Sequence, residues 1–158
     1  KDMIQRIQSL YLLLAGALMF CMFKMPLATF INEAGVWKFY ADSIIETASD
    51  TSTTATIDTW PVAIIIALAG VLSFIAIFGY KNRRRQIKIC MLSGLFMLLF
   101  YPIAFIYWWF AKDMLATEAF PSLGAVLIFP LVALILVVIA VRSIKADERL
   151  VRSADRIR

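Results

Sequence analysis

Apolar residues are gathered along this chain into long runs, each close to the length of a membrane span. An α-helix rises about 1.5 Å per residue, so about 20 residues cross the roughly 30 Å hydrocarbon layer of a bilayer. The runs occupy residues 4–23, 60–80, 87–110 and 121–141. This pattern predicts an all-α integral membrane protein with four transmembrane helices, folded as one bundle over residues 3–158. Lys1 and Asp2 precede Met3 and are interpreted as an added extension.

The connections between these runs differ in charge, and the difference predicts their orientation. Lysine and arginine collect on the cytoplasmic side of membrane proteins. The connection between the second and third runs has no acidic residue, and its basic residues are Lys81, Arg83, Arg84, Arg85 and Lys88. Residues 32–59 are acidic on balance. Both termini are therefore predicted to be cytoplasmic. The interfacial residues Trp60, Trp108 and Trp109 should share the opposite face.

Two prolines fall inside predicted helices. Pro102 lies in the middle of the third run and Pro130 in the middle of the fourth. Each removes a backbone hydrogen bond, so each is expected to kink its helix. A fixed bend is the simpler interpretation of both. A hinge, or an opened carbonyl that binds a ligand, is the alternative.

The connection formed by residues 32–59 is the longest outside the apolar runs. Its first half, residues 35–42, alternates partly between apolar and polar residues and is rich in strand formers, which predicts one strand or a short β-hairpin. Its second half, residues 47–59, is rich in threonine and serine and is interpreted as a solvated linker. Residues 26–31, just before it, are interpreted as a tail of the first run.

The C-terminal residues 142–158 predict a basic amphipathic helix. This helix either continues the fourth span or turns onto the membrane surface, where basic residues meet anionic lipid; docking on a protein partner is the alternative. Asp147 and Glu148 are expected to pair with nearby arginines of the tail. The candidate partner contacts at the two ends of the chain are Arg6, Arg149, Arg152 and Arg156.

Composition argues against several kinds of chemistry. Apolar residues make up 62% of the chain and histidine is absent, so the commonest metal ligand and the usual general base near neutral pH are missing. No carboxylate lies in the middle of a run, which argues against a proton relay or a cation pathway. Ser73 and Ser93 have no base to activate them. Ser73 lies four residues after Ala69, and this pair of small residues is interpreted as a helix-packing contact. We expect no catalytic residue, metal or cofactor, and hence no enzyme.

The formal net charge of +5 matters mainly through where the basic residues lie. Lys24, near the end of the first run, has a stem long enough to carry its ammonium to the interface. A bound anion or a pairing with Glu33 is the alternative. The candidate contacts to anionic lipid or another anion are Lys24, Arg83, Arg84, Arg85 and Lys88. In so short a connection the arginine run favours lipid phosphate over nucleic acid.

Cys21 and Cys90 fall near opposite predicted membrane faces. A disulfide requires Cα atoms within about 7 Å, so a bridge between them is not expected. Both are interpreted as small apolar packing residues.

Three segments carry a family resemblance: MIQRIQSLYLLL at residues 3–14, RQIKICML at 85–92 and ADERLVRSADRIR at 146–158. They resemble the Bacteroidota family of four-helix membrane proteins called domain of unknown function 4293. The resemblance implies a bacterial inner-membrane protein without an assigned activity, and it brings no catalytic residues. The four-pass plan with a large first outer loop is also similar to claudin-like proteins, although their paired loop cysteines are missing here.

These observations favour a non-enzymatic scaffold, assembly or accessory subunit. Its expected partners are anionic membrane lipids and an unidentified protein or a second copy of the chain. The alternative is a small transporter or channel for a lipid or an apolar compound. Such a transporter would use the bends at Pro102 and Pro130 and the rim near Lys24.

Overall fold

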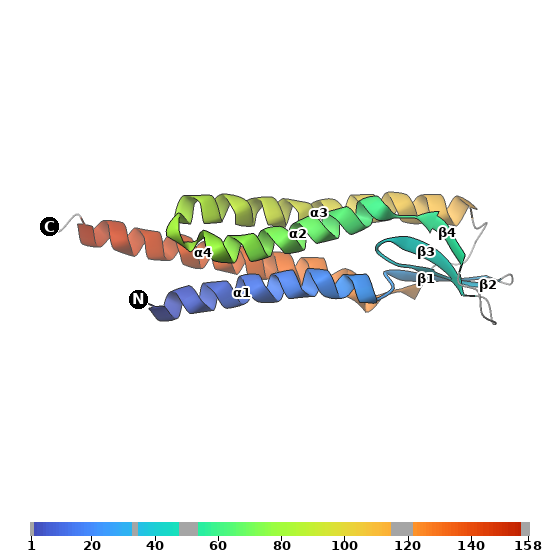
Figure 1. The fold of residues 1–158 in the computed structure, drawn as a ribbon, viewed down its shortest axis with the longest axis horizontal. Helices are drawn as coiled ribbons and strands as arrows, with labels where there is room; N and C mark the ends of the chain where they lie inside the picture. The colour runs from blue at the N-terminus through green and yellow to red at the C-terminus, as the bar shows by residue number, and fades with distance from the viewer. Residues whose placement is uncertain (1, 33–34, 48–53, 115–121, 156–158) are drawn as a thin grey trace.

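Four long helices form a bundle with a small β-sheet at one end (Figure 1). The computed structural model describes residues 2–32, 35–47, 54–114 and 122–155. The helices are α1 (Asp2–Cys21), α2 (Trp60–Phe78), α3 (Arg83–Met114) and α4 (Phe129–Asp155). Short 3-10 helices adjoin them: η1 (Met22–Lys24), η2 (Gly79–Lys81) and η3 (Ala125–Ile128). The start of α1 and the end of α4 lie at the end of the bundle opposite the sheet.

All four predicted spans are present as helices. The segments long and apolar enough to cross a membrane are Ile7–Lys24, Trp60–Phe78, Arg83–Asp113 and Ala125–Asp147. Because α2 begins and α3 ends beside the sheet, Trp60, Trp108 and Trp109 lie at the same end, as predicted. The fourth span begins at Ala125, four residues later than expected, and residues 115–121 fall outside the described part.

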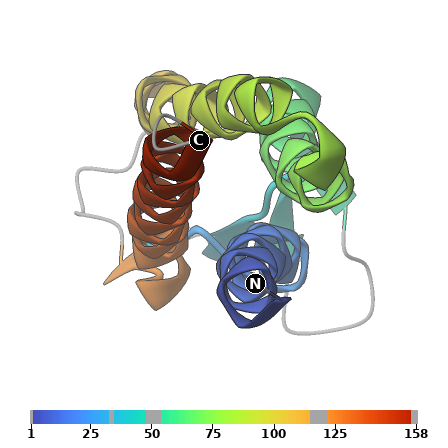
Figure 2. The ribbon, with the colours of Figure 1, turned by 90° about the vertical axis from the view of Figure 1, so that its left-hand side faces the viewer.

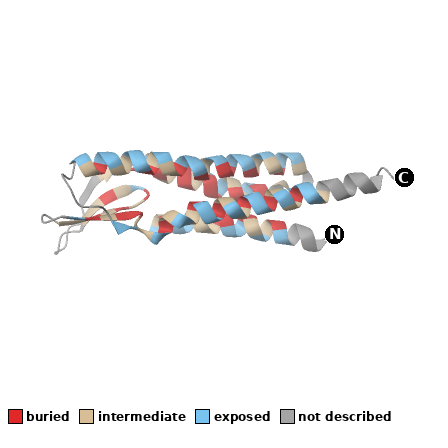
Figure 3. Cartoon of the chain, turned by 180° about the vertical axis from the view of Figure 1, so that it is seen from behind, coloured by how far each residue is buried: buried red, intermediate tan, exposed pale blue. Residues whose placement is uncertain are grey.

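The helices pack in a ring, with α1 and α3 each lying against α2 and α4 (Figure 2). Buried and exposed residues alternate along each helix (Figure 3), and the buried apolar residues form the core cluster. Fully buried members of the core include Leu12, Met19, Ile66, Met97 and Phe100. Large apolar side chains also cover the outer surface, among them Leu10, Leu68, Leu95 and Ile135. An outer surface this apolar fits lipid rather than water.

The sheet has five antiparallel strands in the order β4-β3-β2-β1-β5. They are β1 (Ala28–Asn32), β2 (Gly35–Phe39), β3 (Ser43–Thr47), β4 (Thr54–Asp58) and β5 (Ser122–Leu123). The four helices and the strand expected within residues 35–42, which is β2, are confirmed. The expectation that the rest of the chain is all-α, with at most a short hairpin, is wrong. Residues 26–31 do not extend the first helix, and residues 54–58 form a strand rather than a linker. Threonine and isoleucine favour strands when a neighbouring strand can pair with them.

Backbone and side-chain hydrogen bonds fix the sheet to the helices. The Leu27 N–H donates to the Phe39 carbonyl at 2.6 Å, and the Gly124 N–H donates to the Leu27 carbonyl at 2.9 Å. On the other side, the buried Thr59 hydroxyl lies 3.3 Å from the carbonyls of both Tyr40 and Ala41. The sheet is thus held at the starts of both α2 and η3.

Pro130 is not in the middle of a helix. It lies in the first turn of α4, directly after η3, where a missing N–H is tolerated. The prediction of a mid-helix kink at Pro130 is therefore wrong. Pro102 does lie inside α3, which runs through it as one 32-residue helix.

The described part of the C-terminal tail continues α4 as far as Asp155. Asp147 pairs with Arg83 at the start of α3, at 2.7 Å, whereas pairing within the tail was expected. The contact is available because α4 runs past the start of α3 at this end of the bundle (Figure 1).

Candidate functional site

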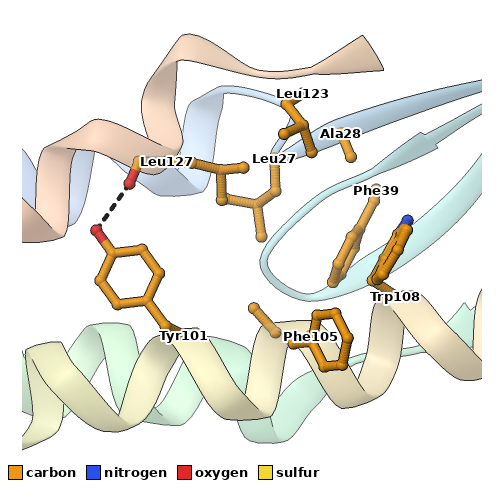
Figure 4. Close-up of a pocket in the computed structure, with 9 residues that line it drawn as sticks. Leu27, Ala28, Phe39, Tyr101, Phe105, Trp108, Leu123 and Leu127 are labelled. Atoms are coloured by element: carbon orange, nitrogen blue, oxygen red, sulfur yellow. Dashed lines mark hydrogen bonds between the residues drawn. The ribbon is translucent and has the colours of Figure 1, made fainter. Parts of the chain in front are cut away.

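A pocket of about 370 Å³ lies between the sheet and the adjoining ends of α3 and η3 (Figure 4). Its lining comes from α3, η3, the strands β1, β2 and β5, and the residue before β1: Leu27, Ala28, Phe39, Tyr101, Ala104, Phe105, Trp108, Leu123 and Leu127. All of these side chains are apolar or aromatic. The pocket is within the size range of small-molecule sites, about 300–1,000 Å³.

The α3 wall follows from helix geometry. Tyr101, Ala104, Phe105 and Trp108 are spaced so that they share one face of the helix. Phe105 packs against Trp108, with ring centroids 5.1 Å apart. Ala104, buried between the large rings, leaves the space that becomes the pocket.

The sheet wall is one register row across three strands. Leu123 of β5 pairs with Ala28 of β1, and Ala28 pairs with Phe39 of β2. Residues directly opposite each other in an antiparallel sheet point to the same face. The row therefore presents three apolar side chains to α3.

Tyr101 joins α3 to the start of the fourth span. Around η3, backbone N–H groups bond to the carbonyl three residues back: Leu127 to Gly124 at 3.1 Å, and Phe129 to Val126. The corresponding bond from residue 130 to Leu127 cannot form because proline has no N–H. The Tyr101 hydroxyl donates to this Leu127 carbonyl at 2.9 Å (Figure 4). The carbonyl that Pro130 leaves without a backbone donor is therefore hydrogen-bonded to Tyr101 of the protein itself.

Gly124 allows the chain to pass close to the start of β1. A Cβ atom at this position would overlap the carbonyl oxygen of Pro26 and lie 3.0 Å from that of Leu27. Both are backbone atoms that no side-chain rotation can move. The absence of a side chain at Gly124 therefore sets the spacing of η3 from the sheet, and with it one edge of the pocket.

The chemistry of the pocket is that of a hydrocarbon site. No described charged residue lines it, and the Tyr101 hydroxyl is already committed to Leu127. The Trp108 indole N–H is buried and has no hydrogen-bond partner in the described structure. Nor does the described part of the chain bring three metal-ligating side chains together. The site can therefore enclose an apolar group.

The candidate anion contacts are divided between the two ends of the bundle. Arg84, Arg85 and Lys88 are exposed at the start of α3, on the side of the chain termini. Arg83 is held by Asp147. Lys24 is exposed at the sheet end. The structure therefore does not bring Lys24 together with the arginine run.

Other predicted residues have mixed outcomes. The side chains of Arg6, Arg149, Arg152 and Arg156 lie outside the described residues, as does Glu33.

Both cysteines are free, as expected. Cys90 is buried, which fits a packing role, but Cys21 is exposed, so the packing interpretation is wrong for it.

Ser73 and Ser93 are both buried and join α2 to α3. Their hydroxyl oxygens are 2.8 Å apart, and each lies within 3.0 Å of the Ala69 carbonyl. The packing interpretation is confirmed for Ser73, and a polar link between helices is added to it.

The pocket was missed by sequence reasoning. The only signal was the aromatic face from Tyr101 to Trp108, which has the same spacing as a lipid-facing or core stripe. The opposite wall comes from three strands, and of these the sequence predicted only β2, which contributes Phe39.

A comparison with curated proteins finds no match. A family model described as "Domain of unknown function (DUF4293)" matches residues 4–157. The four-helix chain with its small sheet is therefore a member of the DUF4293 family.

Proposed function

We propose that this protein is a non-enzymatic scaffold, assembly or accessory subunit of a bacterial inner membrane. The observation that carries the proposal is the attachment of the sheet. Hydrogen bonds from Thr59 and Gly124 hold it to the starts of the second and fourth spans. A platform held this firmly above a membrane is suited to binding another protein or a second copy of the chain. The absence of histidine and of mid-span carboxylates supports a role without catalysis.

Charge supports an orientation with both termini in the cytoplasm. Exposed basic residues at the terminal end of the bundle are Arg84, Arg85, Lys88, Arg142 and Lys145. The exposed acidic residues Asp42 and Asp58 belong to the sheet end. This asymmetry matches the positive-inside rule.

Cysteine labelling in intact cells tests the orientation. In a Cys21→Ser background, Asp58→Cys should react with a membrane-impermeant maleimide added outside, once the outer membrane is permeabilised. Arg84→Cys should react only after the inner membrane is opened. The reverse pattern would contradict the proposal.

The outward face of the sheet is where a partner is expected. A register row across this face joins Thr29, Lys38 and Ile45, and Ile31 beside it is 60% exposed. A photocrosslinking amino acid at Ile31 should give a discrete adduct in native membranes. The same amino acid at exposed Leu95, on the lipid-facing side of α3, serves as the control. No adduct at Ile31 beyond that control would count against a docking platform.

The second candidate is a small transporter or channel for a lipid or an apolar compound. The apolar lining of the pocket favours such a cargo over an ion. Flux of a fluorescent lipid between the leaflets of reconstituted liposomes tests this candidate. Ala104→Phe, which fills the pocket, should then slow the flux. A flux rate for the wild-type protein equal to that of protein-free liposomes would rule out the transporter hypothesis.

A further inference from the structure

We propose that the pocket beneath the sheet holds one acyl chain of a phospholipid from the leaflet on the sheet side. This goes beyond the scaffold role, because it assigns a ligand class to a site inside the fold. Three independent features of the pocket support the proposal: its depth along α3, the apolar residues at its rim and the polarity of its lining.

Depth places the pocket in the hydrocarbon layer. At about 1.5 Å per residue, Tyr101 lies roughly 20 Å along α3 from Lys88, and Trp108 lies roughly 30 Å from it. The hydrocarbon layer is about 30 Å thick, and Lys88 is the last charged residue before the span interior. The wall from Tyr101 to Trp108 therefore spans the acyl region of the sheet-side leaflet.

The rim of the pocket is apolar and open. Phe105 on α3 is 55% exposed and Leu123 on β5 is 69% exposed, and both belong to the lining. They lie on opposite walls of the pocket (Figure 4). At this depth their exposed surfaces meet lipid chains rather than water, so the bilayer itself supplies the occupant.

Polarity selects the part of the lipid that enters. The Tyr101 hydroxyl is committed to Leu127, and no described charged residue lines the pocket. The Trp108 indole N–H is a donor without a partner in the described structure, but it is buried, and a single donor cannot replace the hydration of a headgroup. An acyl chain has no hydration to lose there. It exchanges contacts with neighbouring lipid chains for contacts with the lining, and it fills space that would otherwise lack contacts. The headgroup then stays at the interface, at the level of Trp109.

Native mass spectrometry of the full chain, released from phospholipid nanodiscs into mild detergent, tests the proposal. Wild-type protein should retain one phospholipid through delipidation. Ala104→Phe fills the pocket from α3 and Ala28→Leu fills it from the sheet, so either should abolish the retained adduct. Ala146→Phe adds the same ring at an exposed position on α4 and should retain the lipid. Circular dichroism and thermal unfolding identify the variants that fold.

Three results would overturn the proposal. One is equal lipid retention by wild type and by a folded pocket variant. Another is a wild-type protein that retains no lipid. The third is a retained free fatty acid or non-lipid apolar compound instead of a phospholipid. Ala104→Phe and Ala28→Leu fill the pocket from different walls, so if one variant misfolds, the other still tests the proposal. None of these results depends on whether a protein partner binds the sheet.

Discussion

The Tyr101 hydroxyl donates a hydrogen bond of 2.9 Å to the Leu127 carbonyl, across the gap between α3 and η3. Pro130 leaves this carbonyl without the backbone donor that would continue the 3-10 helix. The side chain thus supplies a bond that the backbone cannot make. It also fixes the start of the fourth span against the third at the edge of the pocket.

Removing this hydroxyl should destabilise the bundle. Tyr101→Phe leaves the Leu127 carbonyl without its donor. Because this bond is only part-buried, the expected loss is near the lower end of the roughly 1–3 kcal/mol that an unsatisfied buried polar group costs. Equilibrium unfolding in detergent measures the loss. Tyr107→Phe removes a hydroxyl from the same helix and serves as the control. If the two variants unfold alike, the Tyr101 bond does not stabilise the fold.

Adding one methyl group at Gly124 should detach β5 from β1. In Gly124→Ala the new Cβ would meet the backbone carbonyls of Pro26 and Leu27, so the strands must separate, at an expected cost of at least about 2 kcal/mol. Thermal unfolding measures stability, and limited proteolysis near residue 122 reports detachment.

The matched control for this change is Gly94→Ala. Its Cβ would meet only the end of the Leu134 side chain, at 3.2 Å, and a rotamer change can relieve that contact. An unfolding midpoint for Gly124→Ala equal to that of Gly94→Ala would contradict the proposed close approach.

The two buried serines should respond unequally to substitution. Three short contacts join Ser73, Ser93 and the Ala69 carbonyl, but two hydroxyls supply only two protons. In Ser73→Ala the Ser93 hydroxyl can still donate to Ala69, so α2 and α3 stay linked. In Ser93→Ala the remaining hydroxyl bonds within α2 and the link is lost, at about 0.6 kcal/mol, the average for such bonds between membrane helices. In detergent, the free energy of unfolding of Ser93→Ala should be lower than that of Ser73→Ala. The opposite order would refute the assignment of the link between α2 and α3 to the Ser93 hydroxyl.

The ion pair between Arg83 and Asp147 should contribute little to stability. Its side chains are 38% and 28% exposed, and pairs accessible to water are worth about 0.2–1 kcal/mol. A double-mutant cycle with Arg83→Gln and Asp147→Asn measures the coupling, which should decrease as salt screens the charges. Arg84→Gln, at an exposed neighbouring position, should show no coupling to Asp147→Asn. A coupling that salt leaves unchanged would indicate a more buried pair.

The amino-acid sequence by itself determined the four spans, because about 20 apolar residues in a row have few stable solutions other than a membrane helix. It also located the tryptophans at one end of the bundle. Short strands were harder to predict. Residues 28–32 come shortly after the first apolar run, beyond Lys24 and Pro26, and a short apolar segment fits a strand or a helix equally well. Only pairing with β2 and β5 decides in favour of a strand.

The candidate site depended almost wholly on tertiary structure. The pocket brings together Leu27, Phe39, Trp108 and Leu123, and no periodicity within one segment can report a contact between residues so far apart in the chain. Pro130 shows the same limit. Its lack of an N–H is evident from the sequence, but only the position of Tyr101 decides which group satisfies the opened carbonyl. Local chemistry sets which residues enter the membrane, and the packing of distant segments sets what they enclose.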